Sequence, residues 1–318
     1  MKKLMLVLIV AGLLVAVPAL AGPLAKEQVS ALANWVVHAD VERFRTTQIC
    51  ELIRPELENL GIQEKLLNFE AIFSFHPIDD VRDVTIYGKG QDRKNAVALI
   101  EGTFDKQRLL TIVGMNPEHE EIGYADRVVH KWVDENKKDP DGHGEITYGC
   151  FFQDDLIMIG TGLDAIKHAI DVLKGSARNA ANVNFVQPPA GTKGAFLQIM
   201  AYDLAQIVGD KPDAAVLKQA EQLGLLIGET EGRFYGGLIL KAKSEEAAQA
   251  INKMLDGIVA FATLSGEENP KLAKLANNVK ISCAQSTVLV RLEADPSTVV
   301  QCLKEQWLKK MEKQAQEK

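Results

Sequence analysis

The sequence predicts an α+β fold built from two similar lobes, each a mostly antiparallel sheet with helices packed on one face. Two observations lead to this prediction. Four strand-like segments each run directly into a segment of helical periodicity that begins near a capping residue. In addition, the two halves of the chain open with similar apolar segments, 35–41 and 195–201, which indicates an internal duplication.

The four strand-to-helix junctions share one local chemistry. Asp and Ser oxygens accept hydrogen bonds from the unpaired amides of a first helical turn, and Pro is tolerated at the first helical position. The predicted junctions are strand 97–104, Asp105 and helix 106–113; strand 156–161, Asp164 and helix 165–174; strand 233–243, Ser244 and a helix from Glu245; and strand 287–294, Asp295 and a helix from Pro296.

Two of these helices carry an apolar stripe that predicts packing against a sheet. The stripes are Ile166, Ala169, Ile170 and Leu173, and then Ala247, Ile251, Met254, Leu255, Ile258 and Ala262. Another strand precedes each junction, over 84–88, 146–153, 223–230 and 279–284. Each unit is therefore predicted as strand, turn, strand, helix, with antiparallel neighbours.

The N-terminus has the pattern of a secretory signal. Lys2 and Lys3 precede an apolar run over 4–17, which is short for a membrane span, and Ala19-Leu20-Ala21 is a small-x-small cleavage pattern. We expect cleavage before Gly22 and a periplasmic or secreted product, with no membrane span after cleavage; an uncleaved membrane anchor is the alternative. The predicted organisation is a signal peptide over 1–21, a first lobe over 22–176, a linker over 177–193 and a second lobe over 194–318 with a C-terminal helix.

Composition limits the classes of partner. The formal net charge is −7, and the densest basic cluster lies on the final helix, so we expect no nucleic-acid partner. That cluster, expected to be a solvated helix face, is Lys304, Lys309, Lys310 and Lys313. The four cysteines lack CxxC spacing, which favours buried free thiols or one or two disulfides of undetermined pairing. They are Cys50, Cys150, Cys283 and Cys302.

Common catalytic motifs are absent. The chain contains no GxSxG, SxxK, HExxH, GxxxxGK or GxGxxG; the run that begins at His119 starts like HExxH but lacks the second histidine. We therefore expect no cofactor and assign no catalytic, cofactor-binding or metal-ligating residue. These absences leave open a site assembled from residues distant in the sequence.

Three weak constellations remain. His38 and Asp40 share one face of the opening strand, although outward polar residues on a strand edge are the favoured interpretation. The loop over 139–145 has alternating carboxylates like part of a calcium loop, but lacks the full ligand spacing, so a solvated hairpin is favoured. His130, beside Trp132 on an alternating strand, is expected to be a partly buried core histidine rather than a ligand.

Three segments carry a resemblance. The runs over 35–40, 83–88 and 169–175 resemble an uncharacterised family of secreted bacterial proteins. The resemblance implies export and the overall architecture, and it implies no activity or functional residue.

The leading functional hypothesis is an exported, non-catalytic envelope or secreted protein that binds a protein partner or a small apolar ligand between its lobes. The alternative is an exported enzyme, a hydrolase, with a site built from dispersed residues. His38, Asp40 and His130 are the first candidates for such a site.

Overall fold

The structure is a computed structural model that describes residues 24–138, 142–186, 194–208, 217–264, 266 and 269–316. The predicted signal peptide lies outside the described residues, as do residues 139–141 of the predicted loop and residues 187–193 of the predicted linker.

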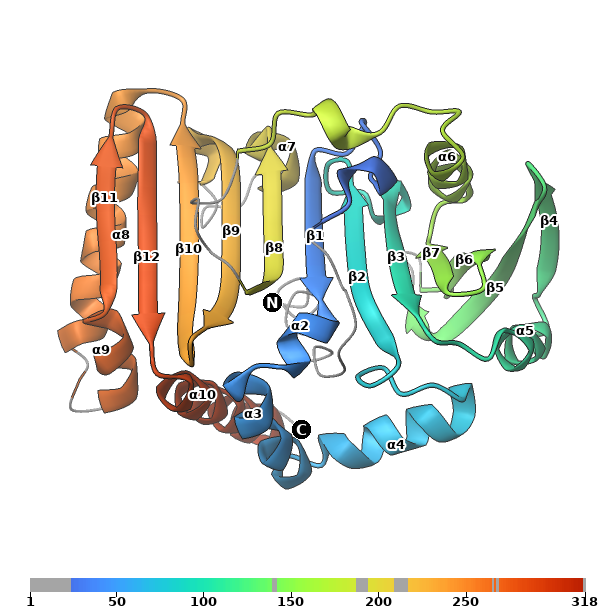
Figure 1. Ribbon diagram of the computed structural model, residues 1–318, viewed down its shortest axis with the longest axis horizontal. Coiled ribbons are helices and arrows are strands. Elements are labelled where there is room, and N and C mark those ends of the chain that lie inside the picture. Colours follow the sequence, from blue (N-terminus) through green and yellow to red (C-terminus); the bar gives the residue numbers. More distant parts are fainter. Residues whose placement is uncertain are drawn as a thin grey trace.

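Within the described residues, twelve strands form one antiparallel sheet, in the order β11-β12-β10-β9-β8-β1-β2-β3-β7-β6-β5-β4 (Figure 1). The strands are β1 (Trp35–Asp40), β2 (Val81–Gly88), β3 (Ala96–Gly102), β4 (Glu120–Tyr124), β5 (Arg127–Lys138), β6 (Gly144–Gln153), β7 (Leu156–Gly160), β8 (Ala195–Tyr202), β9 (Ala220–Thr230), β10 (Arg233–Ala242), β11 (Val279–Ala284) and β12 (Thr287–Ala294). The strand predictions are confirmed, and the fold is α+β with a large antiparallel sheet.

The two halves of the chain meet through the backbone of their opening strands. β1 pairs with β8 from Trp35↔Ala201 to Ala39↔Leu197, and pairs on its other side with β2. The two sheets that the sequence predicts are therefore edge to edge in one continuous sheet. The outermost strands of that sheet are β4 and β11.

The helices begin where local chemistry predicts, with one exception. They are α2 (Val41–Arg45), α3 (Gln48–Asn59), α4 (Ile62–Phe73), α5 (Lys106–Gly114), α6 (Leu163–Leu173), α7 (Leu204–Val208), α8 (Glu245–Leu264), α9 (Pro270–Ala276) and α10 (Pro296–Gln316), with short 3-10 turns η1 (Lys26–Gln28), η2 (Arg93–Asn95), η3 (Ala180–Asn182) and η5 (Leu217–Gln219). Asp105 accepts a hydrogen bond from the Arg108 amide at 2.9 Å, and Ser244 accepts one from the Ala247 amide at 3.2 Å. The prediction for Asp164 was wrong: α6 begins one residue before it, with Gly162 as N-cap.

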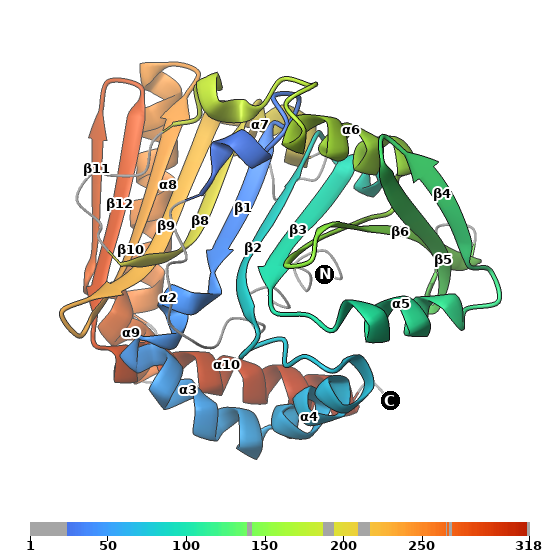
Figure 2. The same ribbon diagram turned by 45° about the vertical axis from the view of Figure 1, so that its right-hand side comes forward.

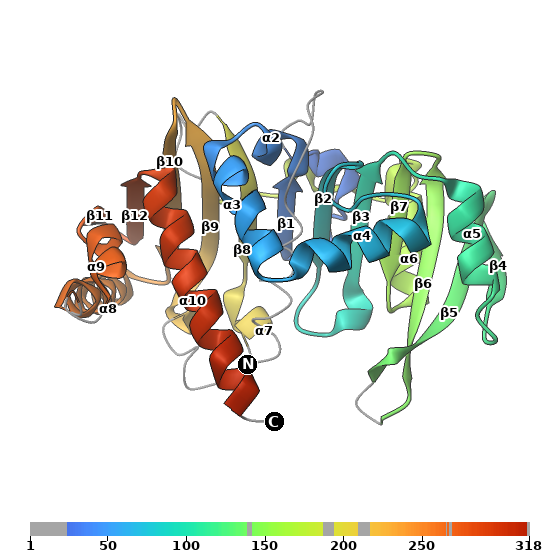
Figure 3. The ribbon, with the colours of Figure 1, turned by 90° about the horizontal axis from the view of Figure 1, so that it is seen from below.

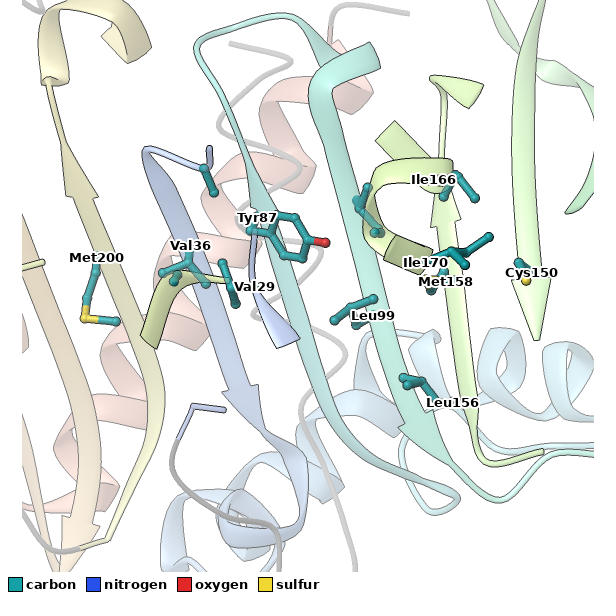
Figure 4. Packing of buried hydrophobic residues seen from close by; sticks show 14 of the residues in the cluster. Val29, Val36, Tyr87, Leu99, Cys150, Leu156, Met158, Ile166, Ile170 and Met200 are labelled. Carbon is teal, nitrogen blue, oxygen red and sulfur yellow. The ribbon is translucent and has the colours of Figure 1, made fainter. Parts of the chain in front are cut away.

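One face of the sheet is covered by α6, η1 and η3. Side chains alternate between faces along a strand, and Val36 lies on this face together with its neighbours Tyr87 and Met200. Ile166 and Ile170 of α6 pack onto the same layer, which Figure 4 shows beside Leu99 and Met158.

The opposite face is covered by α2, α3, α7, α8 and α10. The core there combines Ala39 of β1 with Phe44 of α2, Phe196 of β8 and Val299 of α10. Figures 2 and 3 show α10, α3 and α4 along one end of the sheet. The prediction of helices on one face holds for the second lobe and is wrong for the first, because α6 and α2 cover opposite faces of it.

The segment between the lobes packs against both of them where it is described, since the ring of Phe185 also meets that of Tyr202 on β8, with centroids 5.4 Å apart. Ala180 and Phe185 are buried in the core beneath α6, and Ser30 pairs with Asn179 through the backbone. Ala180 and Phe185 therefore anchor this segment to the core, while the other residues of 176–186 are partly or fully exposed.

None of the four cysteines, all of which are described, forms a disulfide. Three of them, Cys50, Cys150 and Cys302, are buried, and Cys283 on β11 is exposed. Burial raises the pKa of Cys150 to about 11, which keeps this thiol protonated and unreactive.

Among the described residues, no helix has both the length and the apolar character that crossing a membrane requires.

Candidate functional site

His38 and Asp40 lie in the middle of the sheet and are buried. Each is only 5% exposed, because β1 has a strand on either side and helices or 3-10 turns over both faces. The expectation of outward polar residues on a strand edge is therefore wrong. His38 Nδ1 lies 2.9 Å from Thr85 Oγ1 on β2, and Asp40 accepts a hydrogen bond from the Arg43 amide as the N-cap of α2.

Three carboxyl groups share one face at the end of these strands. Asp40 is paired with Asp83 of β2, and Asp83 with Glu101 of β3. The pKa of Asp83 is raised to about 7, chiefly by burial and in addition by the neighbouring carboxylates of Glu101 and Asp40. Burial likewise raises the pKa of Asp40 to about 6.

Charged and amide partners hold the third carboxylate of this row. Glu101 accepts a hydrogen bond from Gln28 Nε2 at 2.9 Å, and Arg82 lies between Glu101 and Asp155, with 2.7 Å to the latter. Asp83 and Glu101 were not singled out from the sequence, since their proximity depends on the pairing of β2 with β3. Hydrogen bonds from Gln28 of η1 and from Arg82 therefore satisfy the outermost carboxylate of this row.

His130 lies far from His38 and Asp40. β5 is separated from β1 by five strand spacings, through β2, β3, β7 and β6, which amounts to about 24 Å. The three residues named for a dispersed enzyme site therefore do not converge on one reacting group.

His130 belongs instead to a cluster on the β4–β5 hairpin. His119 Nε2 lies 3.1 Å from His130 Nδ1, and Glu121 Oε1 lies 3.9 Å from the same nitrogen. One ligand atom from each of the three residues falls within 4.8 Å of the others. The expected partly buried imidazole is confirmed, while its neighbours are a second histidine and a carboxylate.

The backbone of the hairpin positions these side chains. Glu121 is directly opposite His130 in the β4–β5 ladder, so the two side chains share a face. The hairpin turns at Ala125 and Asp126, whose positive φ angles of 44° and 63° match a tight two-residue turn. Val129, next to His130, points to the opposite face and is fully buried.

Asn116 fixes the approach to β4. Its Nδ2 donates to the Val133 carbonyl at 2.9 Å, and its Oδ1 accepts from the Glu118 amide at 3.0 Å. The His119 amide donates to the Asn116 carbonyl at 3.0 Å. The asparagine thus holds His119 against β5 at the point where β4 begins.

Burial and a neighbouring carboxylate shift the pKa of His130 in opposite directions. Burial lowers the pKa of His130, an effect that the nearby Glu121 carboxylate opposes. On the β6 side, the Trp132 indole fills the space above Gly149, the residue paired with His130. The imidazole therefore has an apolar wall on one side and the open edge of the hairpin on the other.

The predicted loop over 139–145 is described only from Gly142 onward. It connects β5 to β6, which confirms a hairpin connection. Glu145 is buried and makes an ion pair with Arg93 at 2.7 Å, so this carboxylate has a structural partner.

A second feature is the apolar face of α8. It packs against the sheet through Ile251, with Ala247 and Leu255 partly buried beside it, as the stripe predicts, and through Ala248, which the stripe did not include. Further along, Met254, Ile258 and Phe261 are exposed, Ile258 by 55% and Phe261 by 76%. The prediction that Met254 and Ile258 are buried was wrong. The side of α8 that packs on the sheet runs through Ala248, Ile251 and Leu255, and at about 100° per residue Met254 and Ile258 are rotated away from the centre of that side.

A cavity of about 340 Å³ lies between β8, β9 and α7. Its lining includes Asp203, Glu221 and Lys243, and contains none of the carboxylates of β1–β3 or the residues of the hairpin cluster. The mixed charge of this lining differs from the apolar lining that an apolar small ligand requires.

Comparisons with known proteins match two solved structures at low sequence identity. No family model and no curated protein matches the chain. The chain is similar to crystal form III of TP0453, with 9% identity, a TM-score of 0.47, and 91% of this chain and 100% of that chain covered. It is also similar to crystal form I of TP0453, with 9% identity, a TM-score of 0.45, and 90% and 98% covered.

Proposed function

We propose that this chain is an exported, non-catalytic binding protein that docks a helix of a protein partner on the exposed apolar side of α8. The observation that carries the proposal is the exposure of Met254, Ile258 and Phe261 on one side of that helix. A soluble protein exposes clustered large apolar side chains chiefly where another surface covers them.

The spacing of these side chains fits a helical partner. Met254, Ile258 and Phe261 follow one another at intervals of 4 and 3, the spacing of a coiled-coil seam. Gly257 lies among the exposed members, and open space surrounds the position of its missing Cβ. A bulky side chain of the partner helix fits this hole in the way that a knob packs between four residues.

Charge and shape favour a protein partner over a membrane surface or a small apolar ligand. α8 carries Lys253 as its single basic residue beside Glu245, Glu246 and Asp256, whereas helices that bind membrane surfaces are rich in Lys and Arg. The surface is open rather than enclosed, which disfavours a small apolar ligand. We place the contact on α8 rather than between the lobes because β1 and β8 are hydrogen-bonded along that boundary.

The proposal includes export and an internal duplication. The N-terminal charge and apolar run support export with cleavage before Gly22. The duplication is supported by strand order: β1-β2-β3-β7-β6 in the first lobe follows the same path as β8-β9-β10-β12-β11 in the second. In this interpretation, β4 and β5 are an addition to the first lobe.

Site-specific crosslinking tests the proposal in cells. A photoreactive residue at Phe261 is expected to give one discrete adduct with another protein, and the same residue at Gln249, exposed on the polar side of α8, is expected to give none. Ile258→Asp should abolish the adduct, since it places a charge in the seam without disturbing buried packing. The crosslinked segment, synthesised as a peptide, should gain helical circular dichroism on binding.

Three outcomes would contradict the docking proposal: equal adducts at 249 and 261, an adduct with the mass of two copies of this chain, or an adduct with lipid alone. Mass spectrometry of the same crosslinked chain reads its N-terminus. A chain that begins at Gly22 supports export, and a chain that retains residues 1–21 in the cytoplasm refutes it.

A further inference from the structure

We propose that His119, Glu121 and His130 form a binding site for a divalent transition-metal ion, of which Zn²⁺ is the representative. The site is independent of the α8 surface, since β4 and β11, the strand next to α8, lie at opposite edges of the sheet. It draws one residue from the loop before β4, one from β4 and one from β5.

The separation of the ligand atoms fits one ion. Two imidazole nitrogens bound at about 2.05 Å lie about 2.9 Å apart at a right angle and about 3.3 Å apart at a tetrahedral angle. The 3.1 Å between His119 Nε2 and His130 Nδ1 falls between these limits. Glu121 Oε1, at 3.9 Å from His130 Nδ1, reaches ligand spacing by a rotation that its exposed side chain, 64% accessible, permits.

The donor set indicates the class of metal. Two imidazoles and one carboxylate suit zinc, copper, nickel and iron, whereas Mg²⁺ and Ca²⁺ prefer all-oxygen sites. Three protein ligands leave at least one coordination position for water or another molecule. That position faces outward, because His119 and Glu121 lie at the edge of the sheet.

The surrounding contacts fix the ligands before any ion arrives. Asn116 bonds to both Val133 and Glu118, so its amide holds the loop that carries His119. At the far end of the hairpin, Tyr124 donates to Asp171 of α6 at 2.8 Å. A β-hairpin that is held at both ends loses little conformational freedom when it binds an ion.

A hydrogen bond between the two histidines is the competing explanation of the 3.1 Å distance. Such a bond needs one imidazole N–H and one lone pair, and it does not need Glu121, whose oxygen at 3.9 Å is beyond hydrogen-bonding distance. Under that explanation Glu121 is not a ligand, so Glu121→Gln leaves any binding of a metal ion unchanged. Under the proposal it removes an anionic ligand.

Titration calorimetry with Zn²⁺ on the chelator-treated chain tests the site, in a Cys283→Ser background because that exposed thiol is itself a zinc ligand. One ion is expected to bind per chain. His119→Ala and His130→Ala should each weaken binding by more than about 100-fold, and Glu121→Gln and Asn116→Ala by about 10–100-fold. His143→Ala, which removes an exposed imidazole outside the cluster, should leave the affinity unchanged.

The spectrum of the Co²⁺ form identifies the ligands independently. Visible d–d bands without a near-ultraviolet sulfur charge-transfer band are expected, and both histidine variants should lose them. Because Glu121 is exposed, its variant tests the site even if a histidine variant misfolds. The absence of Zn²⁺ binding, binding that Glu121→Gln leaves unchanged, or a sulfur band in the Co²⁺ spectrum would each overturn the proposal.

Discussion

At the scale of single residues, the polar groups of β1 and β2 are the most informative feature of the core. Asp40, Asp83 and Glu101 form a row of carboxyl groups across three strands beneath η1. Desolvation raises the pKa of Asp83 to about 7, so the folded protein holds a proton there that the unfolded chain releases near pH 4. This difference links stability to pH.

Asp83→Asn is expected to stabilise the protein at pH 8 by about 1–3 kcal/mol, because wild type must then carry a partly buried charge. Because the pKa of Asp83 is higher in the folded state than in the unfolded state, the protonated carboxyl contributes stability. That contribution is fully present below the unfolded-state pKa and is lost as the pH rises through about 7. The advantage of the variant should therefore shrink to near zero at pH 4. Urea denaturation at both pH values measures it, and an equal gain at both would refute the linkage.

The sequence predicted some of these residues and missed others for a physical reason. The caps at Asp105 and Ser244 depend on contacts within three residues, and both were predicted. His38 was placed on an exposed edge because its burial depends on which strands flank β1. His119 and His130 were noticed separately, and only the β4–β5 pairing joins them.

At the scale of secondary-structure elements, α5 and α6 offer a matched comparison. Asp105 is the N-cap of α5 and accepts the Arg108 amide, whereas Asp164 lies inside the first turn of α6. An N-cap side chain satisfies an amide that would otherwise lack a partner in the helix. A first-turn carboxylate interacts only with the helix dipole.

Asp105→Ala is therefore expected to cost about 1 kcal/mol of unfolding free energy, and Asp164→Ala about 0.3–0.5 kcal/mol. Asp105→Asn keeps an acceptor and should cost less than the alanine variant. The midpoints of urea denaturation give the three values. A larger loss at Asp164 than at Asp105 would contradict the assignment of the caps.

The position of most helices and strands was predictable from the sequence, whereas the packing around them was not. The α8 stripe follows the 3.6-residue period and correctly predicts a helix. Which of its apolar residues face the sheet depends on how the helix is rotated against strands that are distant in the chain. β4 was not predicted, since five residues that include Glu120, Glu121 and Gly123 give a weak strand pattern.

At the scale of the whole molecule, the lobes share both a strand ladder and a core. The ring of Phe44 from the first lobe meets that of Phe196 from the second edge to face, with centroids 4.9 Å apart. Period-2 patterning predicted the strands of each half. The joining of the two sheets through β1 and β8 was not predictable, because backbone pairing between them leaves no trace in either pattern alone.

Because of this shared core, the protein is expected to unfold in one cooperative transition, and Phe196→Ala should destabilise it by about 3–5 kcal/mol as a unit. Far-ultraviolet circular dichroism and tryptophan fluorescence should give coincident urea transitions in wild type and in the variant. Loss of signal from one half at lower urea, with the other half intact, would show that the lobes unfold independently.

The open ends of the twelve-stranded sheet have a consequence for solubility. An unpaired strand is a template for another chain, and natural proteins protect such strands with short length and charge. β4 has only five residues and presents Glu120 and Glu121, and β11 has six and includes Lys280. Pairing of β4 with the β4 strand of a second molecule would bring like charges together. The charges therefore disfavour extension of the sheet from one molecule to the next.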